Sequence, residues 1–99
     1  MATKMQRSSG NVFRDLGLGP AEAANLRIRS TLMMQVRQLI KARHLTQVAA
    51  ARVLGVTQPR LSDLVRGKID AFSIDALVKM LAHAGVTVTV SVRPQSRVA

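Results

Sequence analysis

The sequence predicts an all-α fold of five helices followed by a single C-terminal β-strand, and three observations support it. Apolar residues recur at helical spacing through most of the chain. Near the C-terminus the spacing changes to every second residue, which is typical of a strand. Only Phe13 and Phe72 are aromatic among 99 residues. The core must therefore be aliphatic, and such residues favour helices packed on helices in one domain.

We divide the chain into an N-terminal arm at residues 1–19, a domain at residues 20–94 and a tail at residues 95–99. The arm is basic, with Lys4, Arg7 and Arg14. It also holds an apolar cluster that can form one helical turn, made of Val12, Phe13, Leu16 and Leu18. This cluster is too apolar for a purely solvated tail, so we expect it to contact the domain or a partner.

A long helix is expected over Ala21–Arg43. Pro20 suits its first turn, because the missing N–H of proline would have no partner there. The apolar residues at helical spacing are Ile28, Leu32, Val36, Leu39 and Ile40. The basic residues, most of which we expect to be solvated, are Arg27, Arg29, Arg37, Lys41 and Arg43. We expect the core to include Met33, Met34 and Met80.

Three shorter helices follow, and each begins with a capping residue. Thr46, Thr57 and Ser73 carry hydroxyl groups that can accept a hydrogen bond from an unpaired N–H of the first turn. Two of these caps lie between hydrophobic staple pairs, which are Val56 with Leu61 and Phe72 with Leu77. Gly67 and Gly85 stand where left-handed residues would close the second and third of these helices.

The last element is predicted to be a strand over residues 86–93. Its valines, which alternate with Thr and Ser, are Val86, Val88, Val90 and Val92. Pro94 ends the pattern, and the sequence contains no second strand signal. Because a lone strand leaves its backbone groups unpaired, we expect it to pair with the same strand of a second subunit. The sequence therefore predicts a homodimer.

The residues that favour a particular function lie between Gln47 and Leu64. Ala50 and Ala51 are small at the place where a second helix must cross closely. Gly55 follows four residues after Ala51, where the tight turn between two helices needs a positive φ. Pro59 is tolerated only in the first turn of a helix, which requires that helix to begin at the Thr57 cap. This spacing predicts a helix-turn-helix whose second helix presents a polar first turn to DNA.

The motif resembles that of the Xre/Cro-like helix-turn-helix regulators, which have a lambda-repressor-like fold. The likeness continues into Leu64-Val-Arg-Gly-Lys68 and the helix at residues 74–84. The wider chain, roughly residues 11–94, is similar to the HigA-type antitoxin branch. The segments that carry this second likeness are Asn11-Val-Phe-Arg-Asp-Leu-Gly-Leu18, Leu45-Thr-Gln47, Thr57-Gln-Pro-Arg-Leu-Ser62, Phe72-Ser73 and Val92-Arg-Pro94.

The resemblance implies a sequence-specific transcriptional repressor that binds a palindromic operator as a homodimer. It leaves an alternative open, in which the chain is an antitoxin that neutralises an RNase toxin of the RelE/HigB type and binds DNA for autoregulation. The apolar cluster of the arm would then anchor the toxin. A non-specific RNA or architectural DNA binder fits the charge, but it does not explain the well-formed turn.

Gln58 is the first candidate for a base contact, because a glutamine can bond bidentately to the N6/N7 edge of adenine. Arg60 is the second, with guanine or a phosphate as its target, and Thr57 is the third. Asp63 can orient Arg60, accept from cytosine or form a plain surface pair. The expected phosphate contacts are Thr46, Gln47, Ser62, Arg66 and Lys68.

Composition restricts the other function classes. Fifteen Lys and Arg against five Asp and Glu leave a net charge of +10, which favours a polyanionic partner. No apolar run suits a membrane span, no signal peptide is expected, and the absence of cysteine fits a cytoplasmic protein. His44 and His83 lack metal-ligand spacing, so we expect structural roles and neither metal nor cofactor. The scattered acids form no catalytic constellation, so we expect no enzyme.

Overall fold

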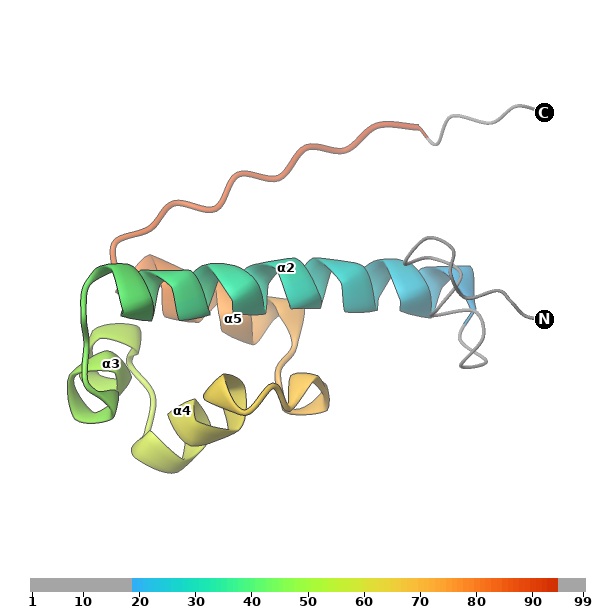
Figure 1. Ribbon diagram of the computed structural model, residues 1–99. Helices are drawn as coiled ribbons and strands as arrows, with labels where there is room; N and C mark the ends of the chain where they lie inside the picture. Colours follow the sequence, from blue (N-terminus) through green and yellow to red (C-terminus); the bar gives the residue numbers. More distant parts are fainter. Residues whose placement is uncertain (1–18, 95–99) are drawn as a thin grey trace.

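The computed structural model describes residues 19–94, and this part of the chain is helical (Figure 1). The elements in chain order are α2 (Pro20–Ala42), α3 (Gln47–Leu54), α4 (Gln58–Val65), the 3-10 turn η2 (Ile69–Ala71) and α5 (Ile74–His83). The all-α prediction is confirmed for these residues, which hold four α-helices rather than five. The helical turn expected at residues 12–18 lies outside the described residues.

Helix α2 is the longest helix and packs mainly against α5 and η2, whereas α3 packs against α4 and α5. Figure 1 shows α3 and α4 on one side of α2, with α5 lying close behind it. The bounds of α2 agree with the prediction to within one residue at each end. The chain leaves α2 through His44, whose φ of 52° is left-handed, and the N–H of Leu45 donates to the carbonyl of Ile40 at 3.0 Å. A histidine in this closing position carries no signal comparable to that of glycine.

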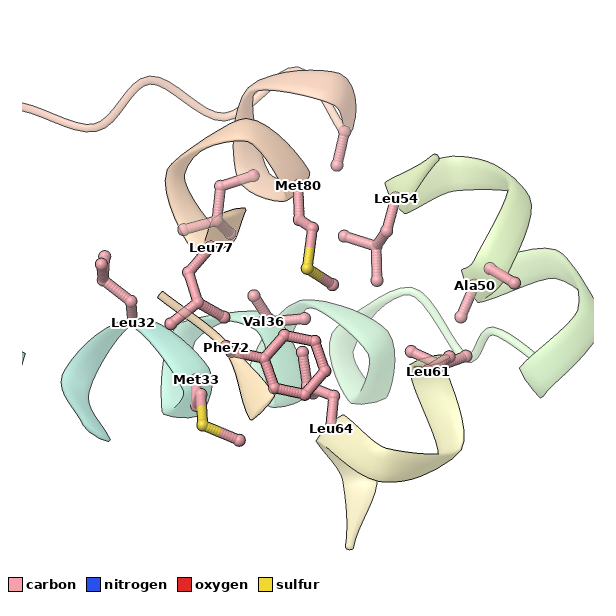
Figure 2. Close-up of a cluster of buried hydrophobic side chains, with 13 residues drawn as sticks. Leu32, Met33, Val36, Ala50, Leu54, Leu61, Leu64, Phe72, Leu77 and Met80 are labelled. Carbon is pink, nitrogen blue, oxygen red and sulfur yellow. The ribbon is translucent and has the colours of Figure 1, made fainter. Parts of the chain in front are cut away.

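One apolar core lies between the helices (Figure 2). Phe72, Leu77, Leu61, Leu64 and Val36 are each no more than 1% exposed. Met33 and Met80 are buried there as expected, but the prediction for Met34 is wrong, because its side chain is 53% exposed. Each residue of a helix is rotated by about 100° from the one before, so Met34 turns away from the core that Met33 enters.

The three predicted caps are confirmed. Each hydroxyl oxygen accepts a hydrogen bond from the N–H three residues later: Thr46 from Ala49 at 3.1 Å, Thr57 from Arg60 at 3.3 Å, and Ser73 from Ala76 at 3.1 Å. The predicted left-handed glycines are confirmed as well, with φ of 80° at Gly67 and 84° at Gly85. These local signals therefore set where the helices begin and end.

The valine segment, residues 86–93, leaves the body as an extended chain that stands off α2 in Figure 1. No strand is formed within residues 19–94. Val86 and Val88 are half-buried against the core, whereas Val90 is 76% exposed and Val92 is 88% exposed. The strand stays a prediction, because a single chain offers this segment no backbone ladder.

Two features of Gly55, its backbone conformation and the space around it, disfavour a side chain at this position. Its φ is 71°, and a Cβ at this position would lie 2.9 Å from Cδ2 of His83. Gly67 is a matched control, because its φ is 80° and no atom lies within 4 Å of its virtual Cβ.

We expect Gly67→Ala to cost about 1–2 kcal/mol of unfolding free energy, through left-handed strain alone. Gly55→Ala should cost about 1–3 kcal/mol more, because its methyl group also meets the His83 ring. Urea denaturation of both variants checks this difference. Equal losses would show that the close approach of His83 has no energetic weight.

Candidate nucleic-acid interface

Helices α3 and α4 form the predicted helix-turn-helix. Ala50 is fully buried and Ala51 is 6% exposed, so the two helices can cross closely. Gly55 adopts the predicted left-handed conformation, and the N–H of Val56 donates to the carbonyl of Ala51 at 2.9 Å. The short turn directs the chain from α3 into α4, which begins at Gln58 after the Thr57 cap.

The first turn of α4 is polar and faces outward. Thr57, Gln58 and Pro59 are exposed. The Thr57 hydroxyl oxygen accepts the Arg60 N–H, which leaves its own hydrogen free to donate to a ligand. Gln58, Ser62 and Arg66 follow one another at spacings of four, so they share one side of the helix. Among the base-contact candidates, Gln58 is therefore well placed to meet a base edge.

Arg60 is placed differently from the expectation. Its guanidinium carbon lies 4.3 Å from the centroid of the Phe72 ring, and Nη1 donates to the carbonyl of Ala71 at 2.8 Å. The side chain is thus engaged by its own domain. Asp63 does not orient Arg60, because its carboxylate pairs with Lys68 Nζ at 3.5 Å. This is the plain surface pair that the sequence left open.

The expected phosphate contacts lie at the ends of the two motif helices and on the outer side of α4. Thr46 and Gln47 are exposed at the start of α3, and Arg66 and Lys68 are exposed at and just after the end of α4. Ser62 is half-buried. The motif therefore presents donors at both ends of α4 and at the start of α3, as a surface that grips a phosphate backbone requires.

Two of the basic residues in the long helix region that we expected to be mostly solvated form hydrogen bonds with distant parts of the fold. Arg29 Nη1 donates to the carbonyl of Ile69 at 3.0 Å, and Arg43 Nη2 donates to the carbonyl of Ala84 at 3.3 Å. The solvated-face expectation holds for Arg27, Arg37 and Lys41, which are exposed. Sequence could not single out Arg29 and Arg43, because every residue has a carbonyl and the partners lie about forty positions away.

His83 has the structural role that was expected. Its Nδ1 lies 2.9 Å from the carbonyl oxygen of Val53, so this nitrogen must carry the hydrogen. The bond ties the end of α5 to α3, beside the Gly55 turn. Within the described residues, no group of three His, Asp or Glu side chains is arranged to hold a metal ion. None of the helices in residues 19–94 is long and apolar enough to span a membrane.

A comparison with known protein families identifies the family of this chain. A family model described as a helix-turn-helix domain matches residues 12–93. The chain belongs to this helix-turn-helix family. No curated protein matches it. The family match supports a DNA-binding regulator, and it includes both the apolar cluster of the arm and the valine segment. The finer likeness to Xre/Cro-like regulators and HigA-type antitoxins stays a prediction.

The cap at Thr57 offers a test of whether the first turn of α4 meets DNA. Thr57→Ala should cost about 1 kcal/mol of unfolding free energy, because it removes the cap of α4. Thr57→Asp should keep that stability, because a carboxylate also caps. If this turn meets DNA, Thr57→Asp should weaken DNA binding by at least about tenfold, since a carboxylate repels phosphates.

Urea denaturation and fluorescence anisotropy with labelled duplex DNA separate the two effects. Parent-like DNA affinity in Thr57→Asp would show that the start of α4 does not face the phosphate backbone.

Proposed function

We propose that this chain is a transcriptional repressor that binds a palindromic operator as a homodimer. The observation that carries this proposal is the exposed, polar first turn of α4 in a well-capped helix-turn-helix. A helix start of this kind meets base edges when it enters the major groove. The net charge of +10 supplies the attraction to phosphates that brings a protein to DNA.

Sequence readout would depend first on Gln58, which can bond bidentately to adenine from the exposed start of α4. Thr57 would add a single hydrogen bond next to it. Arg60 can reach a guanine only by leaving Phe72 and the Ala71 carbonyl. Position along the duplex would come from the phosphate contacts, which are Thr46, Gln47, Ser62, Arg66 and Lys68.

The valine segment supports the dimer. Val90 and Val92 are apolar, exposed and extended, and pairing with a second copy would cover them and supply backbone partners. Two copies related by a two-fold axis would present their α4 helices to half-sites about 34 Å apart, which is one turn of DNA. A dimer bound over a promoter blocks polymerase, and we propose that the chain represses its own operon in this way.

The antitoxin role is the second candidate, and it rests on the resemblance and the apolar cluster of the arm. Residues 12–18 lie outside the described residues, although the family match begins at residue 12. The two roles are compatible, because an antitoxin that represses its own operon needs the same DNA-binding surface.

Selection of bound fragments from random DNA tests the proposal directly, and a palindromic consensus is the expected result. Gln58→Ala should cost about 1–3 kcal/mol on that operator and relax preference at one position of each half-site. Arg66→Ala is the matched control, because it should weaken all DNA alike and lower the salt slope by about 1. If Gln58→Ala binds the operator as tightly as the parent, α4 is not the recognition helix.

Proline substitutions at two adjacent positions test the dimer. Neighbouring N–H groups of a strand point to opposite edges, and only one edge can face a partner. One of Val90→Pro and Thr89→Pro should therefore be monomeric, and the other should stay dimeric. Size-exclusion chromatography with light scattering measures both. A monomeric parent at micromolar concentration, or two dimeric variants, would refute pairing through the valine segment.

A further inference from the structure

We infer that Arg60 is a positioning residue that orients α4, rather than a reader of bases. The inference rests on the proposed function, because it takes α4 as the recognition helix. It concerns which α4 side chains specify the sequence and which hold the helix in place. Three features support it: the contacts of Arg60, a second arginine, Arg29, that also binds η2, and the rotation between residues along α4.

The contacts of Arg60 commit its guanidinium to the domain. The stacking distance of 4.3 Å to the Phe72 centroid is within the range of a cation–π interaction. The bond of 2.8 Å from Nη1 to the Ala71 carbonyl is a charge-assisted hydrogen bond. Phe72 is 1% exposed, so its ring is a fixed platform. To reach a base, Arg60 would have to give up both contacts.

A second arginine holds the same turn from the opposite helix. Arg29 of α2 donates to the Ile69 carbonyl at 3.0 Å, and its Nη1 lies 4.0 Å from the Asp70 carboxylate. Its Nε donates to Asn25 Oδ1 at 2.7 Å, which fixes the guanidinium along α2. We call this arrangement of Arg29, Arg60 and η2 the arginine clamp. It connects α4 to α2 through the backbone of a three-residue turn.

The helical rotation then determines what faces outward. Gln58 and Arg60 are two residues apart, which corresponds to about 200° around the axis of an α-helix. When Arg60 is held against η2, Gln58 must point away from that side. The clamp therefore sets the rotation of α4 about its own axis, and through it the direction of Gln58. In the conformation that the structure shows, the two side chains therefore point to nearly opposite sides of α4.

The test separates positioning from base readout and from plain stability. Thermal unfolding is measured without DNA, and operator and non-specific affinities are measured well below the Tm. The variants are Arg60→Ala, Phe72→Leu and the double variant. Leu32→Val is the matched control, because it loosens the core on α2 and leaves every side chain of the arginine clamp in place. Each operator position is also substituted in turn.

Arg60→Ala should lower the Tm by about 5 °C, and it should lower it less when Phe72 is already Leu. It should reduce the ratio of operator to non-specific affinity by at least about tenfold, the cost of one mismatched base pair. That loss should be spread over every position of the half-site. Leu32→Val should lower the Tm and leave the ratio unchanged.

Several results would overturn the inference. An unchanged Tm with preference lost at a single base pair would make Arg60 a base reader. If Leu32→Val lowers the ratio of operator to non-specific affinity as much as Arg60→Ala does, the effect of Arg60→Ala is one of general stability. If the parent enriches no DNA at all, the proposed function is wrong. The clamp is then decided by the unfolding data alone, and additive Tm losses from Arg60→Ala and Phe72→Leu would refute it.

Discussion

The burial of Phe72 is the constraint on which the other parts of the domain depend. Phe72 is the only aromatic residue within residues 19–94, and it is buried in a core of Leu, Val, Met and Ala. Phe72 and Leu77 stand on either side of the Ser73 cap and both lie in the core, which is the arrangement of a hydrophobic staple that directs the chain into α5. One face of its ring supports Arg60 of α4. A single side chain thus connects the core, the start of α5 and α4.

The basic residues divide into two groups with different uses. Arg29, Arg43 and Arg60 direct their guanidinium groups to backbone carbonyls of distant segments. A guanidinium suits this purpose because its planar donors can serve a carbonyl while its carbon chain packs along the surface. Gross charge therefore overstates the number of cations that can face a polyanion. Within residues 19–94, the Arg66 side chain forms no hydrogen bond to a backbone carbonyl, and Arg66 directly follows α4 in the chain.

Local chemistry made much of this domain predictable, whereas contacts between distant segments were not. A cap depends on a residue and the N–H three positions later, so Thr46, Thr57 and Ser73 could be recognised from the sequence. The left-handed Gly55 followed from the length of the turn. The attachment of Arg60 to Ala71 could not be foreseen, because a carbonyl carries no side-chain signature. The exposure of Met34 was missed because hydrophobicity alone does not fix rotation about a helix axis.

The half-burial of Val86 and Val88 has a mechanical consequence. These two side chains pin the root of the valine segment to the core, while Val90 and Val92 extend beyond it. In a dimer joined through Val90 and Val92, the two helix-turn-helix motifs would be held at a fixed separation, because little free chain lies between the paired segment and the body of each subunit. One extra base pair between half-sites shifts them by about 3.4 Å and rotates them by about 35°. Because Val86 and Val88 are packed against the core, the segment could not bend to follow that rotation. The spacing of the half-sites would then be as strictly required as their sequence.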